Sequence, residues 1–310
     1  MGSAIIPIPK PKLVLAKDLP GFLDDRRARL AAKLDAEGFP RFPYSISDSK
    51  KRQVLETIFD KHWDILKPFF HPQVQMVGGV AKNKPTPALL EELAALVHSQ
   101  WGGKDGWRFS KDEYLQVLRE LNGPTPIFIY YRPNNEVEGA VFPEQVQTAS
   151  ITTWDGTTHN STWKSDTIFG DVGVCPRICS YMQIGGVGKN LIANGALPYF
   201  TVLAYFNYIY DLLAYSRPSE FGPLRANGTS RKEGRTILTH LPRDQTYKFH
   251  MKNGGYLVGV VPDGVNEHDK EAGRMGFIAG YKRNLVASGE LLAVLQQIGA
   301  DVAKLIGLGA

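Results

Sequence analysis

A short glycine-rich segment, Gln183–Gly188, carries the residue types that could hold a phosphate. It follows an apolar run over 172–182 and precedes a second apolar run that begins at Lys189. This order predicts a strand, a tight turn and a helix. Glycine lets the backbone approach a ligand closely, and the free N–H groups at a helix start favour an anion. The same segment is also compatible with a strand-to-helix turn that binds nothing.

Two other phosphate-binding motifs do not fit this segment. A P-loop needs Ser or Thr directly after its lysine, and Lys189 is followed by Asn190. A dinucleotide-binding loop needs a different glycine spacing and an alternating strand–helix pattern before it, which this sequence lacks.

Composition narrows the class of protein. The chain has 310 residues and a net charge of +5, which suits an anionic ligand, but no run of Lys or Arg dominates as nucleic-acid binding would require. We expect no membrane span, since no stretch reaches ~18 uninterrupted apolar residues. We expect no signal peptide and a cytoplasmic location, since Met1–Pro7 has no basic start. Cys175 and Cys179 would lie ~13 Å apart on a strand, too far for a disulfide, so we interpret them as buried thiols.

Helical periodicity dominates the residues before Pro124. Four prolines in 4–20 indicate an extended arm, and Ser110 with Glu113 forms a capping box. Helices are expected over 24–37, 48–67, 86–101 and 110–121. After Pro124 strands are expected over 127–131, 146–154, 172–182, 210–216, 256–261 and 274–281, and residues 142–145 lead into the second of these. Helices are expected there over 189–206, with a break or second start at Pro198, over 245–252 and over 289–307, and 155–171 is expected to be a loop.

The glycine segment reads Q-x-x-G-x-G, and Phe249–Gly255 follows it at the right place in the order of elements. Together they resemble the GCN5-related N-acetyltransferase (GNAT) superfamily over residues 125–285. The resemblance implies an α+β fold in three layers, with a central mixed, mostly antiparallel sheet flanked by helices. It divides the chain into a helical N-terminal region (1–123), an acyl-CoA-binding domain (124–288) and a C-terminal helix (289–310).

The resemblance also implies acetyl-CoA or another acyl-CoA as cosubstrate, and no metal. In the family the pantetheine lies where two neighbouring parallel strands separate, and the pyrophosphate lies on the N–H groups of the glycine loop. The corresponding positions here are Ile178, Cys179, Ser180, Gln183, Gly185, Gly186, Val187, Gly188, Lys189 and Asn190.

Most family members offer a tyrosine as general acid, whereas this chain has His250 at that position. His250, with Ser216 and Arg217 at a strand end, is similar to the GNAT-like loading domains of polyketide synthases, which use a Thr and a His. The resemblance implies catalytic roles for His250, Ser216 and Tyr247, and substrate contacts for Trp154 and Arg217. A buried helix residue and a surface arginine are the plain structural alternatives for His250 and Arg217.

Three functions are compatible with these residues. The first is acyl transfer from CoA to a small-molecule amine, for which Glu144, Asp155 and Asp211 are candidate general bases. The second is malonyl-CoA decarboxylation or acyl transfer to an acyl carrier protein, which the basic loop residues Arg225, Arg231, Lys232 and Arg235 could dock. The third is a non-catalytic CoA-binding protein. The sequence does not indicate an oligomeric state.

Overall fold

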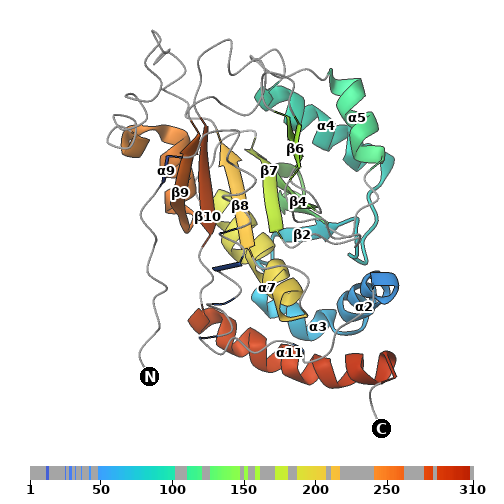
Figure 1. Cartoon of the computed structure of the whole chain (residues 1–310). Coiled ribbons are helices and arrows are strands. Elements are labelled where there is room, and N and C mark those ends of the chain that lie inside the picture. Colours follow the sequence, from blue (N-terminus) through green and yellow to red (C-terminus); the bar gives the residue numbers. More distant parts are fainter. Residues whose placement is uncertain are drawn as a thin grey trace.

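The structure is a computed structural model of the whole chain (Figure 1). It describes residues 12–13, 25, 28–29, 32, 36, 42, 48–101, 110–120, 126–146, 150–152, 158–160, 172–180, 187–206, 211–216, 241–261, 276–281 and 285–307.

A mixed sheet of eight described strands forms the centre of the molecule. Its order is β1-β9-β10-β8-β7-β4-β3-β2. The strands are β1 (Lys12–Leu13), β2 (Val74–Val77), β3 (Ile127–Tyr131), β4 (Val137–Val146), β7 (Val172–Ser180), β8 (Asp211–Ser216), β9 (Gly255–Val261) and β10 (Gly276–Tyr281). The pairs β1·β9 and β7·β8 are parallel, and the other described pairs are antiparallel. A separate hairpin joins β5 (Ser150–Thr152) and β6 (Thr158–Asn160).

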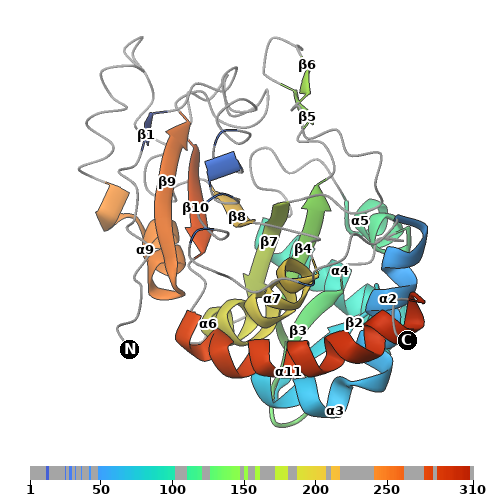
Figure 2. The same cartoon turned by 60° about the horizontal axis from the view of Figure 1, so that its bottom comes forward.

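Helices cover both faces of this sheet. They are α2 (Asp48–Lys61), α3 (Trp63–Leu66), α4 (Pro87–Trp101), α5 (Lys111–Arg119), α6 (Val187–Leu191), α7 (Leu197–Tyr205), α9 (Gln245–Lys252) and α11 (Leu285–Leu305), with short 3-10 turns at Lys67–Phe69 and Leu241–Arg243. Figure 2 shows α6, α7 and α11 in front of the sheet and α4 behind it. The layers are thus helices, sheet and helices.

Alternation along the central strands explains why two cores form. On β3, Phe128 packs into the core beneath α7 and α11, whereas Ile127 and Ile129 pack into the second core, against α4 and α5. On β4, Val141 belongs to the first core and Phe142 to the second. Side chains on a strand point alternately to opposite faces, and both faces of these strands are buried. The expected α+β fold, a mixed and mostly antiparallel sheet between helices, is confirmed.

Several expected elements lie where the sequence placed them, and others differ. The capping box is present: Ser110 N donates to Glu113 Oε2 (2.7 Å) and Glu113 N to Ser110 Oγ (3.2 Å). The strand expected over 146–154 is wrong in extent, since β4 runs from Val137 to Val146 and a separate strand, β5, covers Ser150–Thr152. The loop expected over 155–171 contains β6. Strand β2 was not expected, and the C-terminal helix begins at Leu285 rather than at residue 289.

Residues before Pro124 contribute to the same sheet and core as the residues after it. Strand β2 pairs with β3, placing Val77 opposite Ile127, and Ile58 of α2 belongs to the core that α7 and α11 cover. Of the expected N-terminal arm, Lys12 and Leu13 pair with Gly259 and Val260. The domain boundaries at 123/124 and 288/289 stay predictions.

A π-helical segment, Ile192–Ala196, joins α6 to α7 without a break. Pro198 has no N–H, so the carbonyl of Asn194 lacks the partner that an α-helix would give it. The N–H of His71 donates to that carbonyl instead, at 2.9 Å. The helical run over 187–205 is therefore fastened to the chain segment that leads into β2.

Candidate active site

The parallel strands β7 and β8 pair over a short distance. Val172, Gly173 and Val174 lie opposite Asp211, Leu212 and Leu213, and the ladder ends there. Strand β8 continues to Ser216, three residues or ~10 Å beyond the last pair, while the rest of β7 stays paired with β4. Ser216 therefore lies on the stretch of β8 that is no longer hydrogen-bonded to β7.

Helix α9 positions His250 beside the end of β8 that carries Ser216. Asp244 caps the helix by accepting a hydrogen bond from Tyr247 N at 3.0 Å, which stabilises a helix of only eight residues. After the helix, Gly254 adopts φ +86°, where a Cβ would be strained. A Cβ on Gly255 would lie 2.7 Å from the carbonyl oxygen of His250. These two glycines turn the chain tightly from His250 into β9.

Both ring nitrogens of His250 have hydroxyl partners. Its Nε2 lies 2.6 Å from Ser216 Oγ, and its Nδ1 lies 2.6 Å from Tyr281 Oη. The side chains come from α9, β8 and β10. Ser216 lies opposite Phe277 in the β8·β10 ladder, and Phe277 meets the imidazole edge-to-face with ring centroids 5.5 Å apart.

Cross-strand pairs explain why the imidazole fits over the sheet. Ala279 of β10 lies opposite Ala214 of β8, one step along the same face from the pair of Phe277 and Ser216. Both alanines are buried. Since His250 contacts residues on either side of this small pair, the alanines leave the room that its ring occupies.

Burial sets the charge of His250. The residue is 4% exposed, and desolvation lowers the pKa of its imidazole from 6.5 to about 4. At neutral pH the ring is therefore uncharged, with one N–H that donates and one nitrogen that accepts. An uncharged histidine between two hydroxyl groups can relay hydrogen bonds or move a proton without first losing one.

The first turn of α6 approaches α9 closely. A Cβ on Gly188 would lie 2.4 Å from the ring of Phe249 and 3.0 Å from the side-chain nitrogen of Asn253. Asn253 in turn donates to the carbonyl of Phe249 at 2.8 Å. Glycine at this position thus lets the helix start come within contact of α9, next to His250 in the chain.

The other predicted site residues that the structure describes differ in their burial and contacts. Tyr247 is partly buried, packs on Phe277 with ring centroids 5.8 Å apart, and burial raises the pKa of its hydroxyl. Lys189 is exposed and Asn190 is half-buried, and Asn194 donates to Asn190 Oδ1 at 3.2 Å. Ile178, Cys179 and Ser180 lie on β7 as expected.

Other predictions fall outside the described residues. These are Trp154, Asp155, Gln183, Gly185, Gly186, Arg217, Arg225, Arg231, Lys232 and Arg235. Glu144 and Asp211 are placed on β4 and β8 by their backbones.

Tyr281 was missed by the sequence reasoning. The expected strand 274–281 included it, and alternation places residues 277, 279 and 281 on one face of that strand. What the sequence did not show is that β10 pairs with β8, which brings this face beside Ser216. A hydroxyl-bearing aromatic residue at the end of an otherwise apolar strand was the available signal.

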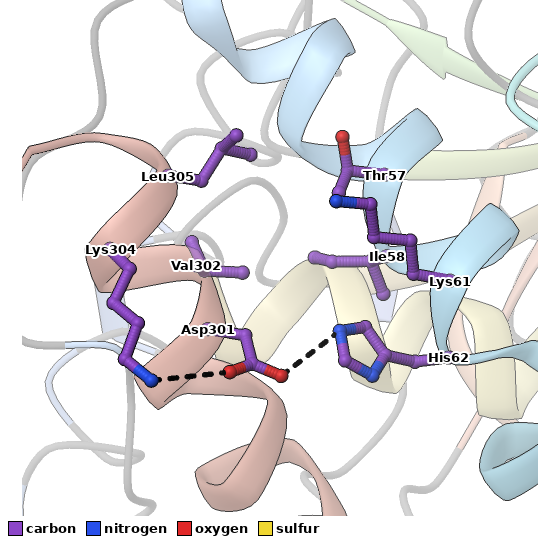
Figure 3. A pocket seen from close by; sticks show the side chains of 8 residues that line it. All are labelled: Thr57, Ile58, Lys61, His62, Asp301, Val302, Lys304 and Leu305. Atoms are coloured by element: carbon purple, nitrogen blue, oxygen red, sulfur yellow. Dashed lines mark ion pairs between the residues drawn. The ribbon is translucent and has the colours of Figure 1, made fainter.

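A hollow lies between α2 and α11 (Figure 3). It is lined by Thr57, Ile58, Lys61, His62, Asp301, Val302, Lys304 and Leu305. His62 Nε2 lies 3.5 Å from Asp301 Oδ2 across it. Figures 1 and 2 both show α2 and the C-terminal part of α11, which line this hollow, away from α9 and β10.

The described residues contain neither a helix that could span a membrane nor a cluster that could hold a metal ion. None of the helices in the described ranges is long and apolar enough to cross a membrane. No three His, Cys, Asp or Glu side chains in those ranges gather where a metal ion would fit.

Comparison with known proteins gives similarities of structure. No protein-family model and no curated protein matches the sequence. The "GphF GNAT-like decarboxylase in complex with isobutyryl-CoA" is 17% identical, with 67% of this chain and 97% of that chain covered and a TM-score of 0.42. The loading GNATL domain of CurA from Lyngbya majuscula is 16% identical, with 67% and 96% covered and a TM-score of 0.45. Malonyl-CoA decarboxylase from Rhodopseudomonas palustris is 12% identical, with 79% and 71% covered and a TM-score of 0.42.

A parallel strand pair that separates, and a helix that starts after the first strand of that pair, are present as the resemblance in the sequence implied. The last two strands, β9 and β10, pair antiparallel. The fold is α+β, with a mixed and mostly antiparallel sheet between helices.

Proposed function

We propose that this protein is an acyl-CoA-dependent acyltransferase that passes an acetyl or similar group from CoA to a small-molecule amine. The observation that carries the proposal is the contact between Ser216 Oγ and His250 Nε2, 2.6 Å long, on the stretch of β8 that has separated from β7. A thioester held there needs mainly positioning and a partner for its carbonyl oxygen.

The CoA chain would lie along the free side of β7. Backbone groups near Ile178–Ser180 would bind the pantetheine amides, and the N–H groups at the start of the helical run from Val187 would bind the pyrophosphate. Lys189, which is exposed, would add a positive charge. Gln183, Gly185, Gly186 and Asn190 remain candidates for the same loop, with Trp154 and Arg217 as candidates for substrate contact.

Ser216 and His250 would act on the acyl group. Negative charge develops on the thioester oxygen as the amine attacks, and a hydroxyl held in place by a buried imidazole can donate to that oxygen. Tyr247, one turn before His250 on α9, remains a candidate for protonating the departing thiolate.

A second function is favoured by the uncharged state of His250. Decarboxylation of malonyl-CoA requires no general base: the bond to the carboxylate breaks, CO2 leaves, and the carbon takes up a proton to give acetyl-CoA. The step needs uncharged donors near the thioester oxygen and no competing cation that would hold the carboxylate in place. Ser216 with a neutral His250 fits this need. In a following transfer step, an acyl carrier protein would accept the acyl group from CoA.

Thermal melting with acetyl-CoA, malonyl-CoA and desulfo-CoA tests both functions, because a ligand that binds only the folded state raises its melting temperature. Each sample is then analysed by mass spectrometry, alone and with a panel of amines. Acylated amine supports the transferase, and acetyl-CoA formed from malonyl-CoA supports the decarboxylase. Ser216→Ala and His250→Gln should lose turnover but keep the shift with desulfo-CoA.

The matched control is His98→Gln, which removes an exposed histidine on α4 and should leave turnover unchanged. A melting shift without turnover of any substrate would support a non-catalytic CoA-binding protein instead. No shift with any of the three ligands would refute both enzyme functions.

A further inference from the structure

His250 is held between two hydroxyl groups that differ in chemistry. Its Nδ1 contacts the phenol of Tyr281 and its Nε2 contacts the alcohol of Ser216. A neutral imidazole carries one N–H and one bare nitrogen, so one hydroxyl donates to the ring and the other accepts from it. Two arrangements are possible, and they give Ser216 opposite roles.

If Ser216 donates to Nε2, the imidazole can take its proton and Ser216 is a nucleophile, as in serine hydrolases. An acyl group would then be carried on Ser216 Oγ after the thiolate of CoA departs. If Nε2–H donates to Ser216 instead, the serine keeps its own O–H, and that O–H is free to donate to a substrate oxygen. The partner of Nδ1 decides between these two roles.

Acidity favours the second arrangement. A phenol has a pKa of about 10, far below that of an aliphatic alcohol, so Tyr281 is the stronger donor of the two and Ser216 the stronger acceptor. The first arrangement would also put a positive charge on the ring when the serine loses its proton. His250 is 4% exposed and its Nδ1 faces a phenol rather than a carboxylate, so that charge would be poorly stabilised.

We propose that Tyr281 is a positioning residue whose O–H donates to His250 Nδ1, so that Nε2–H donates to Ser216 and Ser216 serves as a hydrogen-bond donor to the substrate rather than as a nucleophile. The role of Ser216 toward a thioester rests on the proposed function. The direction of the hydrogen bonds does not, because it is a property of the protein without ligand.

The direct test is ¹⁵N NMR of the ligand-free protein with labelled histidine, at pH 7, with the His250 signals assigned by His250→Gln. We expect a protonated Nε2 and a bare, hydrogen-bonded Nδ1. In Tyr281→Phe the Nδ1 signal should move to the position of a bare nitrogen without a hydrogen bond. A protonated Nδ1 in the natural protein, or an Nδ1 signal that Tyr281→Phe does not move, would overturn the proposal.

The matched control is Tyr130→Phe. It also removes a tyrosine hydroxyl from a side-chain hydrogen bond, here to Gln73 Oε1 at 2.9 Å on β3, away from α9. The Nδ1 signal of His250 should not change in this variant. Should either tyrosine variant unfold, Tyr281→3-fluorotyrosine keeps the shape and makes the phenol more acidic, which should shift the Nδ1 signal further toward the hydrogen-bonded position.

The second test uses turnover and mass. With any acyl-CoA that the protein converts, Tyr281→Phe should lower kcat about tenfold, the effect of one lost hydrogen bond, with little change in KM. Intact mass spectrometry after incubation with that acyl-CoA and no acceptor should show no added acyl group. An acyl adduct that disappears in Ser216→Ala would show that Ser216 is a nucleophile and overturn the proposal even where the proposed function holds.

Discussion

Low pH should destabilise the folded protein through His250, and a comparison with a variant that lacks this histidine measures its contribution separately. Its imidazole has a pKa lowered to about 4 by burial, whereas in the unfolded chain it should have its ordinary pKa of about 6.5. Between these values the unfolded state binds a proton that the folded state does not, so stability rises with pH in this window and falls as pH is lowered through it. The difference between the pKa of His250 in the unfolded and in the folded state corresponds to about 3 kcal/mol of unfolding free energy.

Urea unfolding followed by fluorescence, at intervals from pH 7.5 to pH 4.5, measures this loss. Other groups titrate over the same range, so the quantity to compare is the difference between the natural protein and His250→Gln, whose side chain does not titrate. We expect the natural protein to lose about 2 kcal/mol more than the variant by pH 4.5. The control His98→Gln removes an exposed histidine and should follow the natural protein.

Parallel stability curves for the natural protein and His250→Gln would refute the reasoning. They would mean that His250 binds its proton equally well in both states, and hence that it is not held neutral by burial. His250 would then not be a neutral hydrogen-bond relay at this site.

Substitutions at three further positions test the packing around the site and the fold. Gly188→Ala should destabilise by about 1–3 kcal/mol and weaken desulfo-CoA binding, because its Cβ would overlap the ring of Phe249; unchanged urea midpoint and ligand-induced melting shift would contradict this. Glu138→Gln should lower the free energy of unfolding in urea by about 3 kcal/mol, because Glu138 is fully buried and pairs with Arg132. A loss below about 1 kcal/mol would show that this ion pair adds little to stability. Ser110→Ala should cost about 1 kcal/mol, read from the same unfolding curves, and Ser110→Asp, which keeps a cap, should not.

The sequence predicted best where a local pattern decides the structure. The Ser110–Glu113 box needs four residues in a row and is present as expected. The order of a strand, a helix and a further strand in β7, α6 and β8 was also found, because long apolar runs mark these elements. The short apolar stretch that forms β2 is four residues long, and nothing local distinguishes such a stretch from a loop.

Contacts between neighbouring strands explain what was missed. The first half of β4 contains Glu138, a residue that sequence patterns place on the surface. It is buried because Arg132, across the β3–β4 turn, donates to it from Nε at 2.6 Å. The candidate site shows the same dependence. His250 and Ser216 were singled out by resemblance, but Tyr281 could be found only once the pairing of β8 with β10 was known.

The π-helical segment Ile192–Ala196 has a consequence for changes in chain length. A π turn holds one residue more than the α turn that it replaces, so the helical turns before and after it keep facing the core although the chain is one residue longer. Deleting one residue within this segment should therefore close it into a regular α-helix and leave Tyr199 and Leu203, which are fully buried, on the buried face. Deleting one residue within α7 itself would rotate the rest of that helix by about 100° and should be far less tolerated.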